Sequence, residues 1–190
     1  MVKVAVLASG SGSNFENLVL ATKDGRASKF QIELLIVDKG SAFALERAKK
    51  LGVEALHIDP KGYVDKNAFE SKIIEILEKK DIQLLALAGY MRIVGEKLLN
   101  RYRGRLINIH PAYLPEFPGK DGIGDAFRAG VKETGVTIHF VDEGIDTGEI
   151  IYQERVKIDE GMELEALKER IHAVEHRIYP MVLENLSEKN

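Results

Sequence analysis

The sequence predicts an α/β fold: a doubly wound, mostly parallel sheet with an antiparallel extension near the C-terminus. Two observations carry this prediction. Through the first 110 residues, short apolar runs alternate with stretches of helical periodicity, which is typical of a parallel sheet covered by helices. After residue 118 the alternation stops, and two apolar runs follow each other with only the turn 142–148 between them, which favours an antiparallel pair.

The expected elements run through the whole chain. Strands are expected at residues 2–8, 31–37, 53–58, 84–88, 106–109, 135–141 and 149–158. Helices are expected at residues 15–23, 42–51, 67–79, 125–131 and 164–186. Residues 119–124 are polar and glycine-rich, which predicts a flexible loop. Pro180 lies inside the last helical stretch and lacks a backbone N–H, so it predicts a kink or a break there.

Length and composition indicate one domain that spans residues 1–190, with no internal repeat or linker. We expect residues 1–110 to form a nucleotide- or phosphate-binding half. Residues 111–190 would add a loop, the strand extension and a final helix. The net charge of −3 gives no reason to expect a nucleic acid or an anionic membrane as partner. The absence of cysteine excludes disulfides and thiolate metal sites, and it agrees with a cytoplasmic location.

Asn108 and His110 are two polar residues inside the apolar run 106–110. Side chains two positions apart in a strand point to the same side, so both should project together from the carboxyl end of this strand. Pro111 holds His110 in an extended conformation. A carboxamide and an imidazole placed together suit a reaction in which a carbonyl oxygen becomes negative and a nitrogen loses a proton. The alternative is a structural histidine beside an asparagine that binds loop backbone.

The glycine-serine loop 9–14 joins the first strand to the first helix. This layout points free backbone N–H groups and the positive end of a helix at an anion. Phe15 occupies the third-glycine position of a dinucleotide fingerprint, so the loop fits a single phosphate better than a pyrophosphate. The alternative is a tight turn in which Ser13 or Asn14 caps the helix.

Asp146 lies in the turn between the last two strands, where aspartate is common. A buried carboxylate beside His110 would favour the imidazolium form, which makes Asp146 the natural partner for this histidine. His139 alternates with Thr137 along the preceding strand, and both a core position and a position behind the site remain open for it.

His172, Glu175 and His176 are spaced so that they share one face of the last helix. Such a face has three interpretations. The alternatives are a solvated face, a metal site, or the edge of a substrate site that recognises an amine or a phosphate. No further metal-binding residues elsewhere in the sequence complete a metal set, so no metal is expected.

Five motifs, in chain order and at the family's spacing, resemble the phosphoribosylglycinamide formyltransferase family. They are ASGSGSN (8–14), AGYMRI (88–93), INIHPAYLP (107–115), GVTIHFVDEGIDTG (135–148) and EHRIYP (175–180). The resemblance implies a Rossmann-like formyltransferase fold. It also implies an enzyme of purine biosynthesis that transfers a formyl group from 10-formyltetrahydrofolate to the amine of glycinamide ribonucleotide (GAR). No metal cofactor is implied.

The resemblance also implies roles for individual residues. The catalytic residues would be Asn108, His110 and Asp146. The GAR-binding residues would be Gly12, Ser13, Asn14, His172 and Glu175, with Glu175 at the glycinamide end. The folate-binding residues would be Lys66, Met91, Arg92, Ile93, Val94, Asn108, Asp142, Glu143, Gly144, Ile145 and Asp146. A cis peptide bond before Pro115 is implied as well. The partners would be these small molecules, and both a monomer and a homodimer remain open.

Three segments depart from the family pattern. Residues 111–115 read PAYLP rather than PSLLP and are followed by Glu116. Residues 120–124 lack a histidine that relatives often carry, and Glu149 stands where a proline is usual. We expect these changes to affect loop contacts and folate affinity more than the chemistry.

Other functions compete with this interpretation. Methionyl-tRNA formyltransferase shares parts of the motifs, but it would need an RNA-binding domain and a basic face. Formyltetrahydrofolate hydrolase would carry an additional N-terminal domain and a histidine at the position of Pro111. A nicotinamide-dependent dehydrogenase is disfavoured by the missing third glycine. A nucleotide-binding module without catalysis predicts that Asn108 and His110 have no measurable role.

Overall fold

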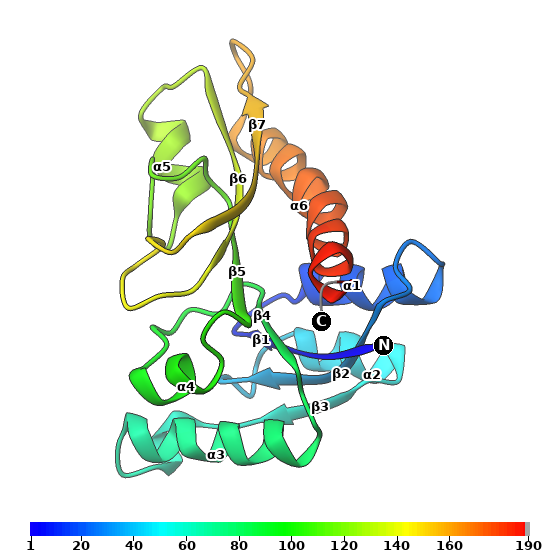
Figure 1. The fold of residues 1–190 in the computed structure, drawn as a ribbon. Coiled ribbons are helices and arrows are strands. Elements are labelled where there is room, and N and C mark those ends of the chain that lie inside the picture. Colours follow the sequence, from blue (N-terminus) through cyan, green and yellow to red (C-terminus); the bar gives the residue numbers. More distant parts are fainter. Residues whose placement is uncertain (189–190) are drawn as a thin grey trace.

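The computed structural model describes residues 1–188 as a seven-stranded sheet with helices on both faces (Figure 1). The strand order is β3-β2-β1-β4-β5-β6-β7. The pairs among β1 to β5 are parallel, and β5–β6 and β6–β7 are antiparallel. The predicted fold class is therefore confirmed.

The elements agree with the expected ones to within a few residues, apart from two short helices that were not expected. The strands are β1 Val2–Ala8, β2 Phe30–Val37, β3 Glu54–His57, β4 Leu84–Leu87, β5 Leu106–His110, β6 Glu133–Phe140 and β7 Ile150–Lys157. The helices are α1 Ser13–Lys23, α2 Ala44–Leu51, α3 Lys66–Lys79, α4 Glu96–Arg101, α5 Gly122–Arg128 and α6 Leu164–Ser187, with a 3-10 turn η1 at Pro60–Gly62. The additional ones are α4 and η1, which are too short to show a clear apolar period.

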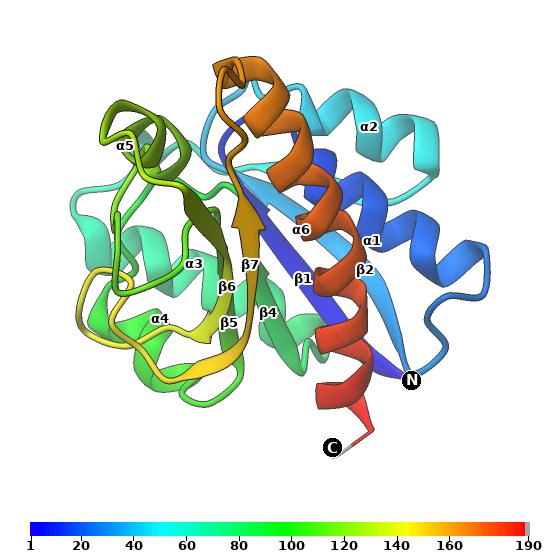
Figure 2. The same cartoon turned by 90° about the horizontal axis from the view of Figure 1, so that it is seen from above.

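Two apolar layers hold the helices onto the sheet. One face of the sheet packs against α1, α2 and α6 through residues such as Phe15, Ala48 and Ile171. The other face packs against α3 and α4 through Ile73 and Leu99. Figure 2 shows the two groups of helices on opposite sides of β1. This arrangement exposes the loops at the carboxyl ends of the parallel strands, where ligands bind in open α/β sheets.

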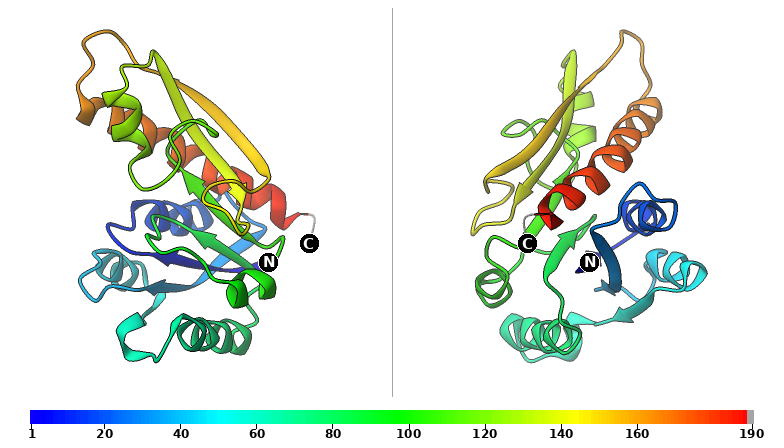
Figure 3. Two further views of the ribbon diagram at one scale, coloured as in Figure 1. Left: turned by 90° about the vertical axis from the view of Figure 1, so that its left-hand side faces the viewer. Right: turned by 45° about the vertical axis from the view of Figure 1, so that its right-hand side comes forward.

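The antiparallel end of the sheet sets the register that matters for the site. Asn108 on β5 lies opposite His139 on β6, and His110 lies opposite Thr137. Figure 3 shows β6 and β7 extending beyond the parallel strands, with α6 alongside them. Since residues directly opposite each other present side chains to the same face, His139 comes to stand beside Asn108.

Two segments that were expected to be irregular are helical in the structure. The expected loop 119–124 becomes helical from Gly122, because the carboxylate of Asp121 accepts the Gly124 N–H at 3.2 Å and caps α5. The expected break at Pro180 is also absent, since α6 continues through this residue. Pro180 leaves the carbonyl of His176 without its intrahelical donor, and the side chain of Asn17 on α1 donates to that oxygen at 2.5 Å. Among residues 1–188, no helix has the length and apolar character needed to span a membrane.

Candidate active site

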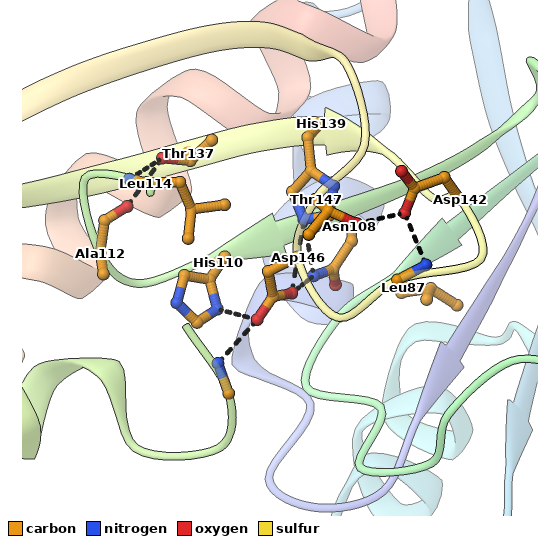
Figure 4. Close-up of polar contacts among 12 residues, drawn as sticks. Leu87, Asn108, His110, Ala112, Leu114, Thr137, His139, Asp142, Asp146 and Thr147 are labelled. Carbon is orange, nitrogen blue, oxygen red and sulfur yellow. Dashed lines mark hydrogen bonds and ion pairs between the residues drawn. The ribbon is translucent and has the colours of Figure 1, made fainter. Parts of the chain in front are cut away.

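Asp146 lies at the centre of a polar cluster at the end of β5 (Figure 4). One carboxylate oxygen, Oδ2, is 3.5 Å from His110 Nδ1 and accepts the Gly119 N–H at 2.8 Å. The other oxygen, Oδ1, is 3.5 Å from both His139 Nε2 and Asn108 Nδ2. The structure therefore brings together Asn108, His110 and Asp146, and it adds His139 as a fourth member.

Asp146 reaches this position through the turn 142–148 between β6 and β7. Its backbone is left-handed, with φ of 55°, which aspartate tolerates better than most residues. The turn is held by Asp142, whose carboxylate accepts the Thr147 hydroxyl at 2.8 Å and the Gly144 N–H at 3.0 Å. Gly148 admits no side chain, because a Cβ there would lie 1.8 Å from the carbonyl oxygen of Phe140. The turn thus has one compact conformation that aims Asp146 at β5.

The surroundings of Asp146 keep its carboxylate charged. Burial alone would raise its pKa, but hydrogen bonds from His139 and the Gly119 N–H, together with the charges of His110 and His139, outweigh burial and lower the pKa. His139 Nδ1 lies 2.7 Å from the carbonyl oxygen of Phe140, which accepts only when Nδ1 carries a proton. Nε2 of His139 lies 3.5 Å from Asp146 Oδ1 and 3.3 Å from Asn108 Nδ2. His139 therefore contacts both the carboxylate of Asp146 and the carboxamide of Asn108.

The loop after β5 is fixed from β6. The buried Thr137 hydroxyl donates to the carbonyl of Ala112 at 2.7 Å and accepts the Leu114 N–H at 3.1 Å. The Leu114–Pro115 peptide bond is cis, as the resemblance implies. Further along the loop, His110 Nε2 donates to the carbonyl of Phe117 at 2.8 Å. Both nitrogens of His110 therefore have a partner, Phe117 at Nε2 and Asp146 at Nδ1.

The turn between β1 and α1 forms an open cradle of backbone N–H groups. Gly12 has φ of 75°, and a Cβ on it would lie 2.5 Å from that of Ala44, so glycine is required here. Arg47 on α2 donates from Nε to the carbonyl of Ser11 at 2.9 Å and holds the turn in place. Among the described residues, no side chain caps α1. The alternative in which Ser13 or Asn14 is the cap is therefore wrong, and the first N–H groups of α1 remain available to an anion.

Glu175 on α6 borders this cradle. Its carboxyl group is buried and accepts a hydrogen bond from Asn14 Nδ2 at 3.1 Å. Burial raises the pKa of Glu175 to about 7, against the opposing effect of Asn14. The side-chain oxygen Oδ1 of Asn14 is buried and has no hydrogen-bond partner within residues 1–188. His172 lies one turn before, with Nε2 at 4.0 Å from the carboxylate, and burial lowers the pKa of this imidazole.

The metal interpretation of this helix face finds no support in the geometry. Within the described part of the chain, no three His, Asp or Glu side chains are grouped so that they could hold a metal ion. The rings of His172 and His176 stack instead, with centroids 6.5 Å apart. The two imidazoles therefore face each other rather than converge on a common point.

Comparison with known proteins assigns the chain and its fold to a family. The formyl transferase family matches residues 2–183. The chain belongs to the formyl transferase family. It is 50% identical to the phosphoribosylglycinamide formyltransferase of Bacillus subtilis (strain 168) over 186 residues, which cover 98% of this chain and 95% of that protein. The crystal structure of glycinamide ribonucleotide transformylase 1 from Geobacillus kaustophilus superposes with a TM-score of 0.94, at 52% identity and 98% coverage of both chains.

A longer relative matches only in part. The trifunctional purine biosynthetic protein adenosine-3 of Gallus gallus is 39% identical over 183 residues, which cover 96% of this chain and 18% of that protein. The resemblance stated from the five motifs, and the expectation of an enzyme, are confirmed by the family match.

Within this member of the formyl transferase family, the segments expected to hold folate lie on one side of the sheet. Val94 and Val141 pack against the same core cluster as α3 and α4. The remaining segment residues are largely at the surface, and the apolar ones that stay exposed are Met91, Ile93 and Ile145. Glu143 forms an ion pair with Arg103 in the turn between α4 and β5, with 2.6 Å between Oε1 and Nη2. Lys66 begins α3 and lies beside Gly95, directly after Val94.

Sequence reasoning missed three residues that shape the site. His139 was left undecided, although its alternation with Thr137 was a usable signal. Thr137 itself and Arg47 were assigned no role, because a threonine in a strand and an arginine in a helix are ordinary. What singles these side chains out is their partners across the fold, which the sequence does not list.

Proposed function

We propose that the protein transfers the formyl group of 10-formyltetrahydrofolate to the amine of GAR, giving formyl-GAR and tetrahydrofolate. The observation that carries the proposal is the placement of Asn108 and His110 around the charged Asp146 at the end of β5, in the same sheet as β1, which leads into the phosphate-type cradle. The named activity of the Bacillus relative, at 50% identity over nearly the full length of both chains, supports the same reaction. No metal or redox cofactor takes part.

The amine nitrogen of GAR attacks the formyl carbon, and the carbonyl oxygen becomes an oxyanion. Asn108 donates an N–H to this oxygen, since its 3.5 Å contact with Asp146 is long and easily exchanged for a stronger acceptor. His110 in its charged form donates a second hydrogen bond, once substrate replaces the Phe117 carbonyl as the partner of Nε2. The two donors together stabilise the tetrahedral intermediate.

The intermediate then breaks the bond between the formyl carbon and the folate nitrogen. The attacking amine loses one proton and the folate nitrogen gains one, so the reaction needs a proton carrier but no net proton source. His110, or a water molecule held by Asp146, carries this proton. Asp146 orients the imidazole through its 3.5 Å contact with Nδ1, and its negative charge stabilises the positive charge that the ring carries while it holds the transferred proton.

The substrates would occupy the two sides of this cluster. The phosphate of GAR would bind the backbone N–H groups at Gly12, Ser13 and Asn14, where the positive end of α1 is uncapped. Glu175 and His172 would contact the rest of GAR. Residues 1–110 would thus supply the phosphate-binding half, and residues 111–190 would complete the folate site.

The folate would contact the segments after β4 and between β6 and β7. These residues are Lys66, Met91, Arg92, Ile93, Val94, Asn108, Asp142, Glu143, Gly144, Ile145 and Asp146. The exposed apolar side chains Met91, Ile93 and Ile145 suit a flat aromatic ring, and the cation of Arg92 suits a carboxylate of the folate tail. A cytoplasmic location and small molecules as the partners agree with this function.

The deciding experiment measures turnover of 10-formyltetrahydrofolate by the purified protein, with and without GAR. We expect deformylated folate only when GAR is present, in a one-to-one ratio with formyl-GAR. Equal turnover without GAR would establish a hydrolase instead. Turnover that requires a different amine acceptor would establish another formyltransferase on the same scaffold.

A further inference from the structure

Glu70 is a buried carboxylate on α3 to which the proposed mechanism gives no role. Only 3% of the residue is exposed. The carboxylate oxygens accept two backbone N–H groups, from Gly95 at 2.5 Å and from Leu98 at 3.2 Å. Both N–H groups belong to the start of α4, which has no capping side chain of its own. Glu70 therefore caps α4 from another helix, 25 residues earlier in the chain.

The capped segment directly follows residues 91–94. Gly95 and Glu70 are in close contact, because a Cβ on Gly95 would lie 2.7 Å from either carboxylate oxygen. One residue before Glu70, the ring of Phe69 lies under the guanidinium of Arg92, with 5.6 Å from its carbon to the ring centroid. Lys66 also reaches Gly95, since its Cε lies 2.7 Å from the same Cβ position. The first turns of α3 thus support the segment 92–98 at several points.

Residues 91–94 have no regular secondary structure to hold them. Their conformation depends on what fixes their two ends. At the first end, the N–H of Met91 donates to the hydroxyl of Ser9 at 2.9 Å. At the other end, the carboxylate of Glu70 holds Gly95. Removing it would leave the part-buried Gly95 N–H and the buried Leu98 N–H without this acceptor and release the end of the segment nearest Val94.

We propose that Glu70 is a positioning residue for the folate, acting through the backbone of Gly95 and Leu98 on the segment 91–94. This inference rests on the proposed function, because it assigns that segment to the folate. It does not involve the GAR cradle, which lies at the N-terminus of α1. Loss of Glu70 should therefore weaken folate binding and leave GAR binding unchanged.

The test compares Glu70→Ala and Glu70→Gln with a matched control, Glu75→Gln. Glu75 is on the same helix but 65% exposed, paired with Lys72. We expect Glu70→Ala to raise the KM for 10-formyltetrahydrofolate about tenfold, in line with the loss of a helix cap, with the KM for GAR and kcat within twofold. Glu70→Gln keeps a carbonyl acceptor and should recover part of the effect. The control should match the wild type. Equal rises in both KM values, or no rise in either, would overturn the inference.

A second measurement keeps this test separate from the proposed function. Hydrogen–deuterium exchange of the substrate-free proteins reports the N–H groups of Gly95 and Leu98 without any turnover. We expect faster exchange at both positions in Glu70→Ala and unchanged exchange in Glu75→Gln. If the wild type lacks GAR-dependent turnover, the proposed function fails. Binding of 10-formyltetrahydrofolate, measured by calorimetry, then decides the Glu70 inference, which is overturned if Glu70→Ala binds as tightly as the wild type.

Discussion

Asp146 and Glu175 are two largely buried carboxyl groups whose pKa values move in opposite directions. Asp146 faces the Gly119 N–H and two histidines, and these donors lower its pKa despite burial. Glu175 faces a single neutral donor, the carboxamide of Asn14, and burial raises its pKa to about 7. The comparison teaches that burial alone does not decide the charge of a carboxyl group. The hydrogen-bond donors that face the group decide its charge. Asp146 therefore stays charged, while Glu175 titrates near neutral pH.

The largest expected effect comes from removing the charge at Asp146. Asp146→Asn should lower kcat by about 10²–10⁴-fold, because the imidazole of His110 loses the anion that orients it and stabilises its positive charge during proton transfer. Steady-state assays with both substrates saturating measure this. Asp125→Asn, at an exposed carboxylate paired with Arg128, is the control and should keep the wild-type kcat. A kcat within twofold of the wild type in Asp146→Asn would remove the charged carboxylate from the mechanism.

Two asparagines, one in each region, test whether the cluster around Asp146 carries out the chemistry while the cradle beside Glu175 binds GAR. Asn108→Ala should lower kcat by about 10²–10³-fold, the usual effect of losing one donor to an oxyanion. Asn14→Ala should instead raise the KM for GAR and leave kcat within a few-fold, because Asn14 lies at the cradle beside Glu175. The same loss of kcat in both variants would show that the division is wrong.

The raised pKa of Glu175 predicts a pH dependence of stability. Between the unfolded value of 4.5 and the folded value of about 7, the folded protein keeps the proton that the unfolded chain has lost. The free energy of unfolding should therefore fall as pH rises through this window, by on the order of 3 kcal/mol, and level off above it. Urea unfolding from pH 4.5 to 8 measures this. Glu175→Gln, which is neutral throughout, should lose this part of the slope, and an identical slope in both proteins would contradict the assignment.

The smallest expected effect concerns the contact that lets α6 pass through Pro180. Asn17→Ala removes the donor to the His176 carbonyl and should cost about 1 kcal/mol of stability. Thermal unfolding measures this loss. Adding Pro180→Ala restores a backbone N–H in the helix, so the double variant should regain stability. If Pro180→Ala changes stability equally with and without Asn17, the two residues are not coupled.

Much of the fold follows from local patterns. The apolar runs that form β1, β4 and β5 are buried almost throughout, and short continuous apolar runs in alternation with helical stretches indicate buried strands. Asn108 and His110 were also predictable as a pair, because their shared side of the strand follows from a period of two. The close approach of Ala44 that excludes a side chain at Gly12, and the absence of a side-chain cap on α1, became visible only in the structure.

The sequence by itself determined the order of elements, the fold class and the pair of side chains at the end of β5. Tertiary structure alone decided the rest, because those features depend on partners distant in the chain. The antiparallel pairing of β5 with β6 set His139 beside Asn108, a contact across 31 residues. The opposite charge preferences of Asp146 and Glu175 arise in the same way, from the groups that folding brings to face each carboxyl group.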